Sequence, residues 1–80
     1  MKPLDECLYY LVREMGNLGA EAKPIYFESA LEHVRRDGLA GMTGLEVRAL
    51  VYAARRRGRL AELDEAVEGC YASCYKCEGG

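Results

Sequence analysis

The stretch from residue 43 to residue 70, TGLEVRALVYAARRRGRLAELDEAVEGC, decides the fold class of this chain of 80 residues. It opens with the pattern of a capping box, in which the Thr43 hydroxyl and the Glu46 carboxylate each accept a hydrogen bond from a free backbone N–H at a helix start. Gly58 then breaks the helical pattern, and apolar residues recur every three or four positions on both sides of it. These residues are Val47, Leu50, Val51 and Ala54 before the glycine, and Leu60, Leu63 and Val67 after it. The stretch therefore predicts two consecutive short helices.

Proline and glycine delimit two further helical segments upstream. The first has Pro3 at its N1 position and ends around Gly16, and the second opens at Pro24 and closes just before Gly38. Their apolar stripes are Leu4, Leu8, Leu11, Met15 and Leu18 in the first segment, and Phe27, Ala30, Leu31 and Val34 in the second. Residues 1–80 are thus expected to form a single all-α domain, a compact bundle of about four short helices with neighbours packed antiparallel.

The small size of the chain predicts a thin margin of stability. A domain of this length buries only roughly 60 to 65 % of the surface that its unfolded chain exposes. Such domains usually supplement their core with a metal, a disulfide or a second copy of themselves. Because half of the residues are hydrophobic, we expect a homodimer that forms through the remaining apolar surface.

Charge is distributed unevenly along the sequence, although the net charge is only −2. Residues 33–59 contain seven arginines against Asp37 and Glu46, whereas the segments on either side are acidic. Helix surfaces that pair internally explain this pattern, and so does a surface that attracts an anionic partner.

The arginines and tyrosines are the candidate binding residues. Arg48, Tyr52, Arg55 and Arg59 recur at helical spacing on a face other than the apolar stripe. Tyrosine and arginine together are typical of interaction hot spots, although tyrosines that rim a small core give the same composition. The full set of predicted binding residues is Arg48, Tyr52, Arg55, Arg56, Arg59, Tyr71 and Tyr75.

A nucleic-acid-binding protein is the first alternative. Two helices separated at Gly58, with the basic run at residues 54–59 between them, favour a helix-turn-helix whose arginines contact phosphates. The second helix would enter the major groove, yet it carries Glu62, Asp64, Glu65 and Glu68. These carboxylates would be repelled by the phosphates, so the sequence favours a protein partner over DNA.

Cysteines form the strongest chemical motif, because Cys70, Cys74 and Cys77 are spaced closely enough for one or two helical turns to present three thiolates. Zinc takes about four such ligands in a tetrahedron, and Cys7 is the predicted fourth ligand, with His33 as the other candidate. The same spacing continues the apolar heptad of residues 60–67, so a row of buried core thiols is the competing interpretation. A thiol redox or metal-handling protein is a third functional class that this cluster allows.

The Cys-x3-Cys-x2-Cys spacing also resembles the iron–sulfur motif of radical S-adenosylmethionine enzymes. Lys76 departs from the pattern of that family, which has an aromatic residue before its third cysteine. The family's fold also requires a barrel far larger than 80 residues can form. Only residues 70–77 carry this resemblance.

Catalytic equipment is sparse, since His33 is the one histidine and the glycine-containing loops lack a phosphate-binding lysine. We therefore expect a cytoplasmic, non-enzymatic binding protein with no membrane segment and with structural zinc as its one candidate cofactor. Its expected function is that of a regulator or inhibitor that docks on a protein, of the kind encoded by phage and mobile elements, such as anti-CRISPR proteins.

Overall fold

The computed structural model describes residues 3–17 and 19–68, and this part of the chain is all helical apart from its connections. The helices are α1 (Leu4–Gly16), α2 (Pro24–Asp37) and α3 (Gly44–Arg56). A further helical run, segment 60–68, extends to the end of the described residues. The predicted all-α bundle of short helices is therefore confirmed. None of the described helices combines the length and the apolar character needed to span a bilayer.

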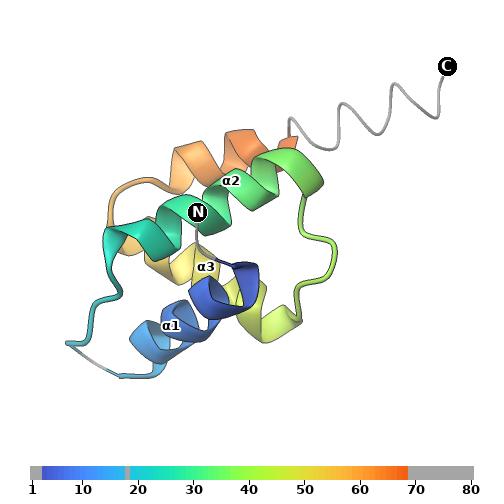
Figure 1. Ribbon diagram of the computed structural model, residues 1–80. Coiled ribbons are helices and arrows are strands. Elements are labelled where there is room, and N and C mark those ends of the chain that lie inside the picture. The colour runs from blue at the N-terminus through green and yellow to red at the C-terminus, as the bar shows by residue number, and fades with distance from the viewer. Residues whose placement is uncertain (1–2, 18, 69–80) are drawn as a thin grey trace, which may run out of the picture.

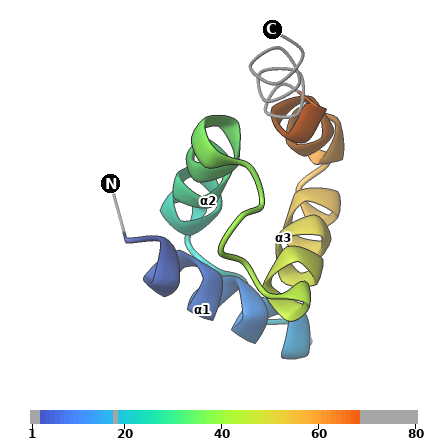
Figure 2. The ribbon, with the colours of Figure 1, turned by 90° about the vertical axis from the view of Figure 1, so that its right-hand side faces the viewer.

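The first helix, α1, is the element against which the two other long helices pack. α1 packs against both α2 and α3, whereas α2 and α3 contact each other much less. Figure 2 shows α2 and α3 rising from α1 as two arms, with segment 60–68 beyond the end of α3. In Figure 1 the chain reverses direction at the turn of residues 57–59, so α3 and segment 60–68 form a hairpin, whereas Figure 2 shows α1 lying across α2 and α3.

Aliphatic and small side chains fill the core between these helices. Phe27 is the largest fully buried side chain, and α3 contributes alanines at positions 49, 53 and 54 that let its backbone approach its neighbours closely. The remaining buried hydrophobic residues are Cys7, Leu8, Leu11, Tyr26, Ala30, Leu31, Val34, Leu50, Leu63 and Ala66.

Local sequence signals explain where the helices begin and end. The Thr43 hydroxyl accepts from the Glu46 N–H at 3.2 Å and the Glu46 carboxylate accepts from the Thr43 N–H at 2.8 Å, which confirms the capping box. Gly38 ends α2 with φ +73°, a value that only glycine adopts without strain. Pro3 is one position earlier than predicted: it is the N-cap of α1, and its carbonyl accepts from the Cys7 N–H at 3.2 Å.

The buried face of α3 differs from the predicted stripe. Leu50 and Ala54 are fully buried as expected, but Val47 and Val51 are only partly buried. Their places in the core are taken by Ala49 and Ala53. Helical spacing alone could not separate these faces, because small alanines make a weak apolar signal although they allow the closest helix contacts. The two valines are thereby left at an open surface beside segment 60–68.

Candidate functional site

A buried ion pair joins the first helix to the end of the third. Both terminal guanidinium nitrogens of Arg57, Nη1 and Nη2, donate to the Glu14 carboxylate, at 3.0 and 2.9 Å, and the Glu14 side chain is completely buried. The Ala22 N–H donates to the same carboxylate at 2.7 Å. Arg57 also donates to the carbonyls of Ala53 and Ala22, at 3.0 and 3.1 Å. This network fixes α1, the connection before α2 and the end of α3 in one arrangement.

The titration behaviour of this pair follows from its geometry. Burial by itself raises the pKa of the Glu14 carboxyl, but the hydrogen bonds from Arg57 and Ala22 outweigh it, so that this pKa lies below its ordinary value. The hydrogen bond to Glu14 raises the pKa of Arg57. Both groups are charged and already bound to each other. We therefore assign the pair to the architecture of the domain and not to a ligand site.

Sequence reasoning missed this network. Glu14 follows Cys7 and Leu11 at helical spacing, so it occupies a position on the core stripe of α1 where an apolar residue is expected. An acidic residue at such a position requires a basic partner, because an unpaired buried carboxylate is very costly. That inconsistency in the stripe was the available signal.

Arg59, a predicted binding residue, forms ion pairs within the domain. Its guanidinium contacts the carboxylates of Glu28 in α2 and Glu62 in segment 60–68, and it lies 5.0 Å from the centroid of the Phe27 ring. Hydrogen bonds to Glu62 and Glu28 raise the pKa of Arg59, and the contact with Arg59 lowers the pKa of Glu62. The structure thus places Arg59 as a link between α2 and segment 60–68.

The other predicted arginines lie on the outer surface of α3. Arg48, Arg55 and Arg56 are exposed, and Tyr52 between them is partly buried. No carboxylate within residues 3–17 and 19–68 forms an ion pair with any of these three arginines. Their charges are therefore available at the surface, unlike those of Arg57 and Arg59.

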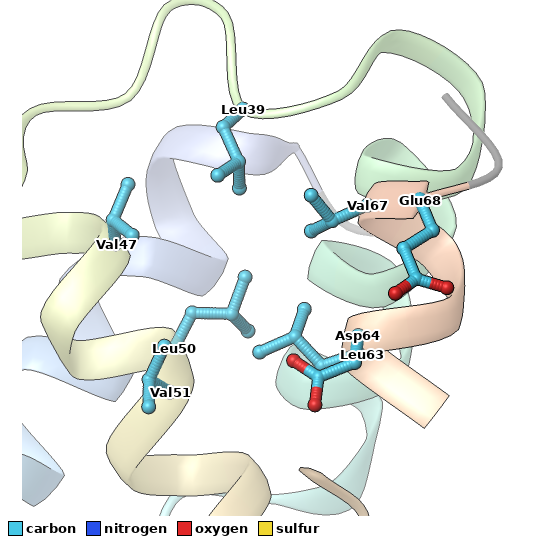
Figure 3. Close-up of a pocket in the computed structure, with 8 residues that line it drawn as sticks. All are labelled: Leu39, Val47, Leu50, Val51, Leu63, Asp64, Val67 and Glu68. Atoms are coloured by element: carbon cyan, nitrogen blue, oxygen red, sulfur yellow. The ribbon is translucent and has the colours of Figure 1, made fainter. Parts of the chain in front are cut away.

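An open apolar groove lies between α3 and segment 60–68, with a cavity volume of about 380 Å³. Figure 3 shows aliphatic side chains pointing into it from both helices and from the loop after α2, with two carboxylates at its rim. Its lining residues are Leu39, Val47, Leu50, Val51, Leu63, Asp64, Val67 and Glu68. This groove, which sequence reasoning did not predict, is the candidate functional site.

The two sides of the groove carry opposite charge. Asp64 and Glu68 border it on segment 60–68, and both are exposed. On the other side, Val51 has Arg48 three residues before it and Arg55 four residues after it, which makes both arginines its neighbours on the helix surface. The groove therefore runs between an acidic border and a basic border.

A second surface feature is a row of three tyrosines on α1 and α2. Tyr10 stacks on Tyr26 with ring centroids 4.4 Å apart, and Tyr9 meets Tyr10 edge to face at 5.2 Å. Arg13 lies 5.7 Å from the centroid of the Tyr9 ring. Burial raises the pKa of Tyr26, with a further contribution from Tyr10. These rings stabilise each other at the edge of the core. They therefore act as tyrosines that rim a small core.

The predicted metal ligands fall in two classes. Cys7 is fully buried in the apolar core of the bundle, whereas Cys70, Cys74 and Cys77 lie outside the described residues, as do Tyr71 and Tyr75. His33 has its Nδ1 3.5 Å from a carboxylate oxygen of Asp37, and its buried Nε2 has no hydrogen-bond partner among the described residues. In that part of the chain, no three histidine, cysteine or acidic side chains are close enough together to hold a metal ion.

Comparison with models of protein families, with curated proteins and with solved structures finds no match for this chain.

Proposed function

We propose that this domain is a non-enzymatic binding protein that docks on protein surfaces through α3 and segment 60–68. The observation that carries the proposal is the open aliphatic groove between these two helices, beside arginines that no described carboxylate neutralises. Surfaces of this kind exclude water from apolar side chains on contact, and the charged borders select the partner. A regulator or inhibitor of the kind found in phage would use such a surface.

The character of the groove favours a protein over a small molecule. Leucine and valine side chains line most of it, and its charged groups, Asp64 and Glu68, stand at one border. Small-ligand sites bury most of their ligand and hold a few precisely placed polar groups inside the pocket, whereas the two carboxylates here stand at the border of an open groove. A shallow aliphatic channel between two helices is suited to the apolar stripe of another helix.

The test blocks the groove with a charge. Val51→Glu places a carboxylate on the partly buried wall, whereas Ile25→Glu makes the same change at a residue that is 44 % exposed on α2, away from the groove. The tagged chain and both variants are used to capture proteins from a nuclease-treated bacterial lysate. Capture of the same protein by the wild type and Ile25→Glu, but not by Val51→Glu, would support the proposal. Equal capture by all three folded proteins would refute it.

A nucleic-acid-binding function is the second candidate, and the exposed group of Arg48, Arg55 and Arg56 favours it. Three phosphate contacts predict affinity for duplex DNA that falls with a slope of about −2.7 in a plot of log K against log salt. Replacing all three arginines by serine should abolish this binding. Retention on DNA that does not change on this substitution would contradict the assignment. The exposed carboxylates of Asp64, Glu65 and Glu68 weigh against this function.

Structural zinc and thiol chemistry also stay proposals that depend on the cysteine motif. Cys7 is fully buried in the core, and thiols at such positions usually act as small apolar residues. Metal analysis of protein purified without chelator tests the zinc proposal. About one zinc per chain that is lost on Cys74→Ser would support it.

A further inference from the structure

We infer that the occupant of the groove is a second copy of this chain, paired about a two-fold axis that runs along the groove. This inference rests on the proposed function, because it takes the same groove as the docking site and names a second copy of this chain as the protein that docks there. A lysate protein that binds the groove would have to displace that copy. In the dimer, α3 of each chain lies against segment 60–68 of its partner. The four helices form one layered contact of the kind found in four-helix bundles.

The charges of the two borders select this arrangement. One border is basic through Arg48 and Arg55, and the other is acidic through Asp64 and Glu68. A two-fold axis along the groove exchanges left and right, so each basic border meets an acidic border. An axis across the groove would instead place α3 on α3, which opposes arginines to arginines. Like charges placed opposite each other are strongly unfavourable at an interface.

The spacing of the charges along the helices is compatible with this pairing. Because α3 and segment 60–68 form a hairpin, residues equally far from the turn lie at similar levels along the groove. At 1.5 Å per residue, Arg55 lies about 3 Å and Arg48 about 14 Å from the turn, while Asp64 and Glu68 lie at about 6 and 12 Å. Arg55 therefore faces the partner's Asp64, and Arg48 faces the partner's Glu68, within the reach of an arginine side chain.

Apolar side chains complete the contact between the borders. Val47, Val51 and Val67 are only partly buried in the single chain, as is Leu39 at the end of the groove. In the face-to-face dimer Val47 and Val51 lie opposite the partner's Val67, because α3 lies against the partner's segment 60–68. The dimer thereby extends a core that an 80-residue chain can only partly enclose.

The test reverses one border at a time and then mixes the variants. The first variant combines Arg48→Glu and Arg55→Glu, and the second combines Asp64→Arg and Glu68→Arg. Either variant alone places like charges opposite each other at both symmetric contacts. It should therefore dimerise at least about tenfold more weakly than the wild type. In an equimolar mixture, the first variant, whose two groove borders are both acidic, meets the second variant, whose two borders are both basic. We therefore expect a heterodimer that restores both contacts.

Native mass spectrometry and sedimentation velocity of the full chain measure the outcome between about 1 μM and about 1 mM, which covers specific and weak dimers. Recovery of a dimer in the mixture also shows that both variants are folded. Val51→Glu should be monomeric, whereas Ile25→Glu should dimerise as the wild type does.

Three outcomes would overturn the inference: a wild type that is monomeric throughout, a dimer unaffected by Val51→Glu, or charge variants that do not pair on mixing. A monomer would leave residues 69–80 or a different protein as the occupant. In that case the proposed function still stands or falls separately, on whether Val51→Glu abolishes capture of a lysate protein.

Discussion

Replacing Arg57 by alanine should remove a large part of the stability of this domain. The substitution deletes the two hydrogen bonds to the Glu14 carboxylate and leaves that carboxylate completely buried with only the Ala22 N–H as a donor. It also deprives the carbonyls of Ala53 and Ala22 of a donor. Breaking one partner from a buried pair costs about 3 to 5 kcal/mol. A domain of this length has a total stability of about 4 to 12 kcal/mol, so the variant should be close to unfolding at room temperature.

Urea denaturation followed by circular dichroism measures this effect. With a dependence of about 1 kcal/mol per molar urea, the transition midpoint of Arg57→Ala should fall by about 3 to 5 M. Arg56→Ala is the matched control, because Arg56 is the preceding residue, is exposed and forms no ion pair within the described residues. Its effect should be below about 0.5 kcal/mol.

A loss below about 1 kcal/mol for Arg57→Ala would refute this reasoning, since a surface ion pair contributes no more than that. The pair would then be open to solvent in solution, and the connection between α1 and α3 would depend on apolar packing alone.

Three further predictions concern acid, capping and backbone conformation. Because the pKa of Glu14 lies below its ordinary value of 4.5, its stabilising contribution is complete above about pH 4.5 and is lost as the pH falls through the depressed value. The stability of Glu14→Gln, measured by urea titration from pH 7 to pH 2, should therefore fall less steeply in acid than that of the wild type, and parallel curves would contradict this. Thr43→Ala should cost about 1 kcal/mol in thermal denaturation by removing the capping box, and an unchanged melting temperature would show that the cap is dispensable. Gly38→Ala should cost about 1 to 3 kcal/mol because φ is +73° there, whereas Gly16→Ala, with open space around its Cβ position, should be neutral or stabilising. Equal effects of the two glycine substitutions would reject the conformational explanation.

The elements of this fold follow from short-range signals in the sequence. The capping box at Thr43, Pro24 at the start of α2 and Gly38 at its end all act within one helical turn, so the residues around them suffice to locate the helix ends. The apolar stripe of α2 was also correct, because its large side chains define one face clearly.

The candidate site could not be predicted in the same way. Arg48, Arg55 and Arg59 look alike in the sequence, yet Arg59 contacts Glu28 across 31 positions of the chain while the other two are exposed. Likewise, Arg57 meets Glu14 across 43 positions. Such partners depend on how α1 and α2 cross α3, which no local pattern encodes.

The sequence by itself determined that this protein is helical, where its first three helices begin and end to within about one residue, and that arginines gather near the end of the third helix. Only the tertiary structure decided which of these arginines are used inside the domain and which side of α3 stays uncovered. The physical reason is that helix formation depends on neighbours within a turn, whereas burial depends on the packing of whole helices. α3 packs on α1 and buries its alanines at positions 49, 53 and 54, and this leaves Val47 and Val51 to line the groove.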